Sequence, residues 1–462
     1  MEKYAEYPVE NTQKYLSKSR LSERDAKVVW HPFTQHFTAP FSIPIVRGEG
    51  TYLYDDAGKR YIDAISSWWV NLHGHSHPYI AQKVMEQFLK LEQVIFAGFT
   101  HEPAVRLAER LLEILPANPR KIFYSDNGST AVEVALKMAI QFFHNQGFTK
   151  KRKVIALENG YHGDTFGTMA VGTKSAFNAP FEGFLYETIY LPTPSKGQES
   201  VALEMMQTLM KNADETACFI FEPLIQGAGG MVMYEPEILE KLIQLAKDHQ
   251  VLTIADEIMT GFGRTGKMFA TDYLATKPDI FCLSKGLTGG AVALGVTSCT
   301  QEIYEAFLSE DRKKTLFHSH SFTANPLACT AGLASLDLLL TQETSNKILI
   351  INKLHNNFRN KLLENGFGKI VCGDTDNEER FHPKITDIRI KGTILAIEIY
   401  TPEGTSYFSN IRDIAYQFFI EKGILIRPLG NVIYLLPPYC ISEDNLKYIY
   451  DCIEAFLDEK IS

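Results

Sequence analysis

Short apolar runs alternate with amphipathic stretches through the centre of the chain, from about residue 105 to residue 300. The runs are continuous in apolar residues, which is the pattern of parallel strands covered on both faces. Five of them predict strands: KIFYS (121–125), KVIALE (153–158), ACFIFEP (217–223), VLTIADE (251–257) and DIFCLSK (279–285). Helices are predicted between them, for instance at 129–143 and 236–250. This order predicts an α/β fold with a mostly parallel sheet and right-handed crossovers.

The two ends of the chain have a different pattern. Residues 1–75 contain hairpin-like pieces such as GTYLYDDAGKRYID, and residues 330–462 alternate helices with polar loops. We therefore expect a large central domain over residues 76–329 and a smaller α+β domain built from both chain ends.

Composition narrows the class of protein. Of the 462 residues 45% are hydrophobic, and the formal net charge is −9, which argues against a nucleic-acid or membrane-surface role. The seven cysteines are scattered without a Cys-x-x-Cys pair, as expected of reduced thiols in a cytosolic protein. The first residues are polar and acidic, unlike a signal or transit peptide, and no run approaches the ~18 apolar residues of a membrane span. We expect a cytoplasmic protein.

Chemically capable residues stand at the ends of three predicted strands. Asp256 ends one apolar run, and Lys285 ends another, just before the small-residue turn GLTGG. Gly128, Ser129 and Thr130 form a turn directly before a helix. Taken singly, Asp256 and the Gly-Ser-Thr turn are better explained as helix caps, and Lys285 as a solvated charge. Together they suit pyridoxal phosphate: the helix start offers N–H groups and hydroxyls to a phosphate, Asp256 can keep a pyridine nitrogen protonated, and Lys285 can form a Schiff base with an aldehyde.

Two other motifs suggest different chemistry. GFGRTG (261–266) matches the G-x-G-x-x-G fingerprint of dinucleotide-binding oxidoreductases. However, its first glycine does not directly follow the strand and no convincing helix opens on its last, so this reading is disfavoured. The triplet His73, His75 and His77 could indicate a metal, but no carboxylates or cysteines converge on it, and we expect a turn with local hydrogen bonds and no metal.

Five segments carry a resemblance to a known family: ENGYHGDTFG (158–167), FEPLIQGAGGM (221–231), ADEIMTGFGRTGKMFA (255–270), SKGLTGG (284–290) and FTANPLAC (322–329). The chain resembles the class III, ω-type aminotransferases of fold type I, from about Trp30 to beyond Tyr439. The resemblance implies pyridoxal phosphate as cofactor, and a large domain with a mostly parallel sheet beside a smaller α+β domain.

Four further segments narrow the resemblance: WHPFTQ (30–35), SSWWVNLHGHSHP (66–78), AGFTHEPAVRLAERL (97–111) and RPLGNVIYLLPPY (427–439). They are typical of members that convert 8-amino-7-oxononanoate to 7,8-diaminononanoate in biotin biosynthesis. Phe33 stands where many S-adenosylmethionine-using members carry tyrosine, and phenylalanine there also occurs in lysine-using relatives. Since SSWW is the usual form of the S-adenosylmethionine group, we expect that donor, with lysine as the alternative.

The resemblance also implies roles for single residues. Lys285 would be the Schiff-base lysine and proton carrier, Asp256 the partner of the pyridinium nitrogen, and Gly128 and Ser129 the phosphate contacts. Tyr161 would stack on the cofactor ring and touch the substrate, and Ile258 would cover the other face of the ring. Asp164 would lie behind the site, with Glu222 and Gln226 at its floor. Phe33 and Trp68 would line the substrate pocket, and Arg427 would pair with the substrate carboxylate.

The family's sites are built at a two-fold dimer interface, so the resemblance implies a homodimer. The loop HSHSFTANP (318–326) would enter from the other subunit, with Ser321 and His320 at the cofactor and Ser319 at the substrate. These three residues stand where glycine, proline and threonine are often found. Serine in place of threonine keeps the hydroxyl, whereas the two preceding changes can alter the path of the loop.

Two classes of alternative stay open. Another ω-aminotransferase, acting on ornithine or 4-aminobutyrate, or an aminomutase would share the cofactor residues but would not need the four narrowing segments together. A non-catalytic binding or regulatory protein on the same fold is disfavoured because Lys285 and Asp256 are both present.

Overall fold

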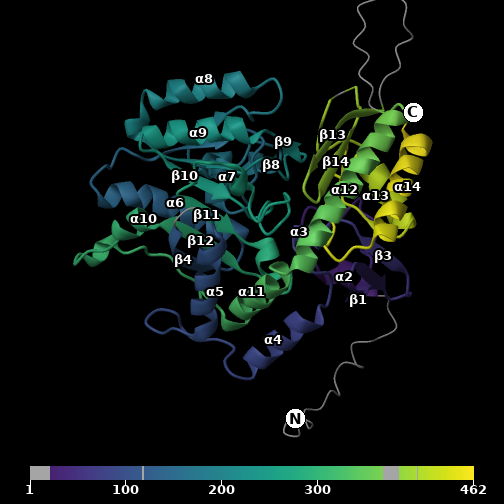
Figure 1. Ribbon diagram of the computed structural model, residues 1–462, viewed down its shortest axis with the longest axis horizontal. Coiled ribbons are helices and arrows are strands. Elements are labelled where there is room, and N and C mark those ends of the chain that lie inside the picture. The colour runs from purple at the N-terminus through teal and green to yellow at the C-terminus, as the bar shows by residue number, and fades with distance from the viewer. Residues whose placement is uncertain (1–20, 117–118, 368–383, 403, 462) are drawn as a thin grey trace, which may run out of the picture.

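The computed structural model describes residues 21–116, 119–367, 384–402 and 404–461, so that Cys372 lies outside the described residues. A seven-stranded sheet in the order β4-β12-β11-β10-β7-β5-β6 forms its centre, with helices around it (Figure 1). Its strands are β4 (Pro119–Ser125), β5 (Lys153–Leu157), β6 (Thr188–Leu191), β7 (Thr216–Phe221), β10 (Leu252–Asp256), β11 (Ile280–Leu283) and β12 (Gly295–Thr300).

All five predicted strands are present in this sheet, and the predicted mostly parallel order is confirmed. Only β12 runs antiparallel to its neighbours, β11 and β4. Neither β12 nor β6 was predicted. The sequence of β12, GVTSCT, is small and partly polar, so it has no apolar run to mark it as a buried strand.

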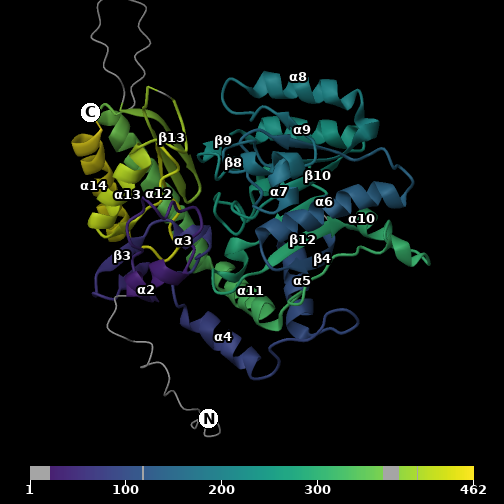
Figure 2. The same cartoon turned by 180° about the vertical axis from the view of Figure 1, so that it is seen from behind.

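Side chains from both faces of the sheet are buried, as the continuous apolar runs predicted. Within β7, Cys218 and Ile220 face a core shared with α6, while Phe219 and Phe221 face a core shared with α8 and α9. In Figures 1 and 2, α8 and α9 lie side by side beyond the sheet. The helices of this part are α4 (Pro78–Phe88), α5 (Glu102–Ile114), α6 (Gly128–Asn145), α7 (Phe166–Val171), α8 (Glu199–Met210), α9 (Pro236–Asp248), α10 (Gln301–Glu305) and α11 (Pro326–Leu339).

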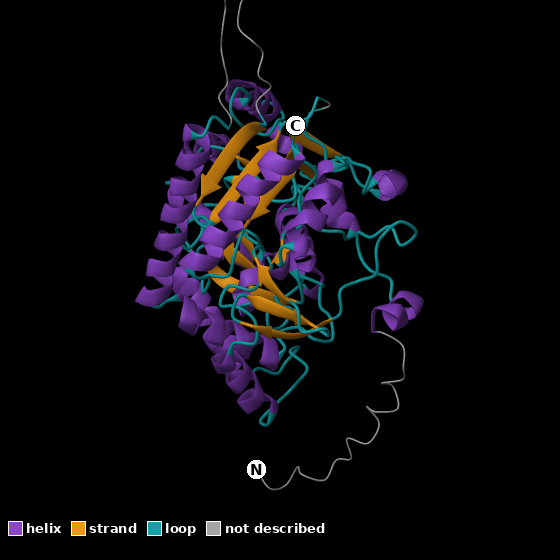
Figure 3. Ribbon diagram, turned by 90° about the vertical axis from the view of Figure 1, so that its right-hand side faces the viewer, coloured by secondary structure: helices purple, strands orange, loops and turns teal. Residues whose placement is uncertain are grey.

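The two ends of the chain meet in a second sheet, β1-β2-β3-β15. In it β15 pairs in parallel with β3, although the two strands are far apart in sequence. A third sheet, β13-β14-β16, and three long helices lie beside it; Figure 3 shows these helices and strands facing the viewer. The elements are α2 (Leu21–Val28), β1 (Ile45–Glu49), β2 (Tyr52–Asp55), β3 (Arg60–Asp63), α3 (Ser66–Trp69), α12 (Gln342–Glu364), β13 (Ile385–Lys391), β14 (Ile394–Ile399), α13 (Ile411–Glu421), β15 (Ile424–Leu425), β16 (Val432–Leu435) and α14 (Glu443–Lys460).

The predicted hairpin in the N-terminal part is confirmed as the β2–β3 pair. The predicted domain boundaries, after residues 75 and 329, stay predictions. In the described part of the chain, no helix combines the length and the apolar character that crossing a bilayer requires.

Candidate active site

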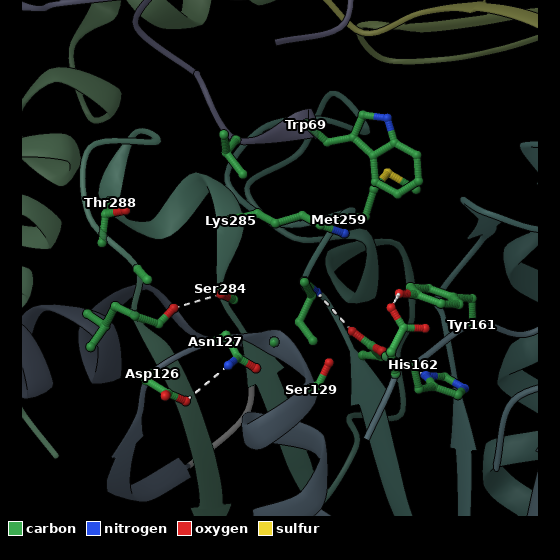
Figure 4. A pocket seen from close by; sticks show the side chains of 18 of the residues that line it. Trp69, Asp126, Asn127, Ser129, Tyr161, His162, Met259, Ser284, Lys285 and Thr288 are labelled. Atoms are coloured by element: carbon green, nitrogen blue, oxygen red, sulfur yellow. Dashed lines mark hydrogen bonds and ion pairs between the residues drawn. The ribbon is translucent and has the colours of Figure 1, made fainter. Parts of the chain in front are cut away.

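A cavity of about 600 Å³ lies at the carboxyl ends of the parallel strands of the large sheet. This is the edge at which α/β sheets place their ligands. Figure 4 shows the side chains around it. Among the predicted site residues, those that line it are Gly128, Ser129, Tyr161, Asp164, Glu222, Asp256, Ile258 and Lys285.

Asp256, the last residue of β10, is held by two neighbours. Its Oδ1 accepts the N–H of Ile258 at 3.1 Å, and its Oδ2 lies 2.7 Å from Nδ1 of His162. Burial lowers the pKa of the His162 imidazole, but the hydrogen bond and charge of Asp256, with the charge of Glu222, outweigh burial and leave the pKa raised. The raised pKa shows that the Asp256 carboxylate favours the charged form of the imidazole beside it.

Lys285 begins a single 3₁₀ turn, η4 (Lys285–Thr288), directly after β11. Its backbone φ is +45°, a left-handed conformation that is uncommon outside glycine. Burial lowers the pKa of its amine to about 8, although the charges of Asp256 and Glu222 act in the opposite direction. An amine with such a pKa is partly neutral near neutral pH, as a nucleophile or base must be.

Glu222 follows β7 and orders the loop that carries Tyr161. Its Oε2 accepts the N–H of Tyr161 and its Oε1 the N–H of Gly227, both at 3.0 Å. Burial raises the pKa of Glu222 to about 7, with His162 acting in the opposite direction. The hydroxyl of Tyr161 donates to Asp164 at 2.9 Å, which fixes the ring over the cavity.

The start of α6 is shaped for an anion. Asn127 caps the helix by accepting the N–H of Thr130 at 3.0 Å, and the Thr130 hydroxyl donates to Asp126 at 2.8 Å. Thr130 is therefore occupied by the cap and does not offer the free N–H and hydroxyl that the sequence suggested. The N–H groups of Gly128 and Ser129, the first two of the helix, have no intrahelical partner and lie at the cavity.

Glycine is required where two loops approach this helix start. A Cβ on Gly163 would lie 2.1 Å from the Ser129 hydroxyl oxygen, and its φ is +132°. A Cβ on Gly128 would lie 3.0 Å from the Ile258 side chain. The space between helix start and loops is thus kept clear.

The predicted substrate residues form a separate cluster next to the cavity lining. The Phe33 and Trp68 rings meet edge-on with centroids 5.6 Å apart, and the guanidinium of Arg427 lies 5.1 Å from the Trp68 ring centre. The Phe177 ring also meets the Phe33 ring edge-on, with centroids 5.9 Å apart. Trp68 is joined to the cavity through its sequence neighbour Trp69, which lines it.

Other predicted residues do not line the cavity within one chain. Gln226 is buried, donating to the Glu158 carbonyl at 2.6 Å. In the loop before α11, the Ser321 carbonyl accepts from Gln93 at 2.6 Å, and Ser319 and His320 lie at the surface beside Thr323.

The two competing motifs have structural roles. GFGRTG forms turns without a helix, and its Arg264 is buried, donating to the Pro437 carbonyl at 2.8 Å. His75 lies 2.8 Å from Asp63, and His73 lies 3.1 Å from the Ser335 hydroxyl. The histidines are thus hydrogen-bonded, but His73 bonds to a residue far away in the sequence, so the expectation of local hydrogen bonds is not met there.

Among the cavity residues that were not assigned from the sequence are His162, Trp69 and Met259. His162 lies inside a quoted segment, directly after Tyr161, and a histidine between two chemically assigned residues was the available signal. Trp69 directly follows Trp68, and the sequence SSWW does not indicate which of the two indoles enters the cavity.

The residues present fit pyridoxal phosphate. An unpaired helix start suits a phosphate, the Asp256 carboxylate suits a pyridinium nitrogen, and the Lys285 amine suits an aldehyde, all around one cavity. A lysine and an aspartate so placed on a mostly parallel sheet define a pyridoxal-phosphate-dependent transferase of fold type I.

Comparison with known proteins gives the family. The class-III aminotransferase family matches residues 33–457, so the chain belongs to it and is a pyridoxal-phosphate-dependent aminotransferase. A relative from Synechococcus elongatus, named adenosylmethionine-8-amino-7-oxononanoate aminotransferase, is 44% identical over 439 residues, or 93% of this chain and 98% of the relative. A relative of the same name from Geobacter sulfurreducens is 39% identical, over 94% of this chain and 96% of its own length.

Solved structures agree with this assignment. The crystal structure of adenosylmethionine-8-amino-7-oxononanoate aminotransferase from Methanocaldococcus jannaschii matches with a TM-score of 0.86 and 35% identity, covering 95% of this chain and 98% of that one. An ω-transaminase from Pseudomonas jessenii in complex with PMP matches with a TM-score of 0.85 and 25% identity, covering 96% and 98%. The family and fold predicted from the sequence are confirmed.

Proposed function

We propose that this chain transfers the amino group of S-adenosyl-L-methionine to 8-amino-7-oxononanoate, giving 7,8-diaminononanoate in biotin biosynthesis. The names of the relatives support both substrates. The observation that carries the proposal is Arg427, a half-buried guanidinium that forms no ion pair within the described residues and lies over Trp68, beside the Lys285 cavity. Such a group is suited to the carboxylate of a long keto acid.

The residues of the chain divide the chemistry among them. Pyridoxal phosphate, when bound, supplies an electron sink for the negative charge that develops at the donor carbon. Lys285 Nζ takes the proton from that carbon, and its lowered pKa provides the neutral amine that this step needs. Asp256, paired with His162, presents a carboxylate, while the N–H groups of Gly128 and Ser129 bind the phosphate.

Replacement of Lys285 tests the proposal. Lys285→Ala is expected to abolish the visible absorbance of the lysine-bound cofactor, and to lower diaminononanoate formation by about 10²–10⁴-fold or more, because it removes the proton carrier. Lys153→Ala is the matched control, because it changes a lysine at the amino end of β5, away from the cavity. This variant should keep the visible absorbance and the activity. Full activity in Lys285→Ala would disprove the proposal.

The same assay identifies the donor. Oxononanoate is incubated with either S-adenosylmethionine or lysine, and diaminononanoate is measured. Turnover with S-adenosylmethionine and none with lysine is the expected result. The reverse result would assign lysine, and activity with neither would point to another ω-aminotransferase.

We also infer that the protein is a cytoplasmic homodimer. Two surface loops carry exposed apolar side chains, among them Ile95, Phe99, Phe317 and Phe322, which are between 62% and 71% exposed. The loops are tied together, since the Gln93 amide donates to the Ser321 carbonyl. Exposed apolar side chains gathered on two connected loops are typical of an interface. The described cysteines are all free, as suits a reducing compartment.

A further inference from the structure

The indole of Trp69 lies against the amine of Lys285 inside the cavity. Lys285 Nζ is 4.5 Å from the centre of the Trp69 ring, and Figure 4 shows the indole beside the end of the lysine side chain. This separation is within the range of about 6 Å in which an aromatic face attracts an ammonium. Tryptophan has the strongest such face, and the attraction grows when both groups are removed from water. Trp69 is only 4% exposed.

The ring is held in place from two sides. Trp69 Nε1 donates to the hydroxyl of Tyr434 at 2.9 Å, and the two rings meet edge-on. Gly227 lies close to the ring, since a Cβ added there would come within 3.2 Å of the indole and a larger residue would crowd it. The main chain is fixed as well, because the Trp69 carbonyl accepts from the buried Arg264 at 3.3 Å.

The backbone that carries the ring is strained. Ser66, Ser67 and Trp69 have φ values of +52°, +58° and +68°, a left-handed conformation that side chains other than glycine rarely adopt. The Asp63 carboxylate holds the turn by accepting the Ser67 N–H at 2.6 Å. Strain of this kind persists only where surrounding contacts enforce it, and it concentrates at functional sites.

The other charged groups around the amine act on it through their charge. Asp256 and Glu222 favour its charged form, while Arg264 disfavours it. Within the described residues, Lys285 Nζ makes no hydrogen bond and no ion pair. The indole face is therefore the contact that the structure gives the amine.

We propose that Trp69 is a positioning residue for Lys285, whose free ammonium its indole face holds through a cation–π contact. Whenever the amine is not bound to the cofactor, this contact keeps it at the reacting edge of the cavity. The inference rests on the proposed function for the role of Lys285, but its test does not use turnover. A failure of the Lys285→Ala assay and a failure of the test below are thus separate results.

Trp69 could act on the amine in two ways, as an apolar side chain that excludes water or as a cation–π partner. The two roles have opposite effects on the pKa of Lys285. If Trp69 only excludes water, replacing it with leucine admits water and raises the pKa of Lys285. If the indole face stabilises the ammonium, the same replacement removes that stabilisation and lowers the pKa. The sign of the shift distinguishes the two roles.

The experiment measures the pKa of Lys285 in the full chain freed of cofactor. The protein is labelled with a trace of acetic anhydride across a range of pH, and the acetylated Lys285 peptide is quantified by mass spectrometry. In Trp69→Leu the pKa is expected to fall by about one unit, and in Trp69→Phe by less, because a benzene ring is a weaker partner than indole. Tyr434→Phe, which keeps the indole but removes its hydrogen-bond acceptor, should shift the pKa in the same direction by the smallest amount.

Trp68→Leu is the matched control, because the Trp68 ring faces Arg427 and not the lysine. It should leave the pKa of Lys285 unchanged. An unchanged or raised pKa in Trp69→Leu would overturn the proposal. If Trp69→Leu does not fold, Trp69→Phe decides in the same way: a fall supports the contact, and a rise or no change overturns it.

Discussion

The substrate cluster illustrates how one charged side chain can decide a binding step. Arg427 has an aromatic face at 5.1 Å and no ion pair within the described residues, so its charge is available to a ligand. An arginine paired with a carboxylate binds it through two hydrogen bonds.

Removal of this guanidinium should weaken binding of the keto acid. We expect Arg427→Ala to raise KM for 8-amino-7-oxononanoate by about 10–100-fold, since hydrogen bonds to charged groups contribute about 1.5–3 kcal/mol, with a smaller effect on kcat. Steady-state kinetics with the acceptor varied provide the measurement. Arg412→Ala, which changes an arginine already paired with Asp413, is the control. An unchanged KM would remove Arg427 from substrate binding.

His162 predicts a pH dependence of stability. Because its pKa is raised in the folded protein, its contribution is present below the unfolded value of about 6.5 and is lost as pH rises through the folded value. We expect His162→Gln to cost about 2 kcal/mol of unfolding free energy at low pH and less at high pH. Urea unfolding of the cofactor-free protein between pH 5 and pH 9 measures this difference.

His355→Gln serves as the opposite case. Burial lowers the pKa of His355 to about 4, so its contribution is present above about 6.5 and is lost as pH falls toward the folded value. The cost of His355→Gln should therefore shrink on acidification, whereas that of His162→Gln should grow. The same trend in both variants would contradict the opposite directions of the two pKa shifts.

Among single residues, Lys285 and Asp256 could be predicted as site residues from the sequence. Each is a polar residue at the end of an apolar run, and that pattern can be recognised within one strand. The sequence could not predict the Asp256–His162 pair or the Lys285–Trp69 contact. Both join residues far apart in the chain, and only the folded arrangement of the loops brings them together.

Among the elements, α6 combines a structural and a binding role at its first turn. The Asn127 side chain caps the helix, and Asn127 also lines the cavity. Its removal leaves the Thr130 N–H unpaired and loosens the turn that presents Gly128 and Ser129.

Asn127→Ala is expected to lower the free energy of unfolding by about 1 kcal/mol, the usual cost of losing a cap, and to weaken pyridoxal phosphate binding several-fold. Denaturant unfolding and a spectrophotometric cofactor titration measure the two effects. Ser442→Ala removes the equivalent cap of α14, away from the cavity, and should affect stability alone. Equal cofactor affinity in both variants would separate the cap from phosphate binding.

Elements with long apolar runs could be predicted because the run itself indicates that the element is buried. The short strands were not. β12 is buried without being apolar, since its neighbours β4 and β11 supply the burial, and β15 has two residues that gain strand character only by pairing with β3.

At the scale of the molecule, Arg264 joins three distant parts of the chain. It lies after β10, is 1% exposed, and donates to the carbonyls of Trp69 and Pro437. The motif that resembled a nucleotide-binding loop therefore connects the large sheet to both chain ends.

Arg264→Met should lower the free energy of unfolding by about 2 kcal/mol. Two buried carbonyls lose their donors at about 1–3 kcal/mol each, and the removal of a buried charge offsets part of that cost. Denaturant unfolding measures the change. Arg110→Met breaks the partly exposed pair with Asp337 and should cost at most about 1 kcal/mol. A larger loss in Arg110→Met would contradict this role for Arg264.

The proposed homodimer predicts complementation between inactive variants. Lys285→Ala disables the lysine of one chain, and Ser321→Asp places a negative charge where the phosphate would bind the loop. If Ser321 of the partner subunit completes each site, dissociating and reassociating the mixture should restore roughly a quarter of wild-type activity, since mixed two-fold dimers contain one intact site.

A mixture of Lys285→Ala and Asp256→Ala is the control. Both changes lie in the same chain's cavity, so no mixed dimer has an intact site and no activity should return. Absence of recovery in the first mixture, with mixed dimers verified by mass spectrometry, would place the Ser321 loop in its own chain's site.

The pairing of β15 with β3 also determines the order in which the parts of the fold can form during synthesis. A ribosome delivers the strands of the large sheet well before β15, Tyr434 and Leu436, so that sheet is complete while the N-terminal turn still lacks its partners. The Ser66 hydroxyl and the Trp69 indole receive their acceptors, the Leu436 carbonyl and the Tyr434 hydroxyl, only when the last part of the chain emerges. Until then the amine of Lys285 lacks its fixed aromatic neighbour. The part of the site that one chain supplies is thus completed only after its C-terminal part has been made.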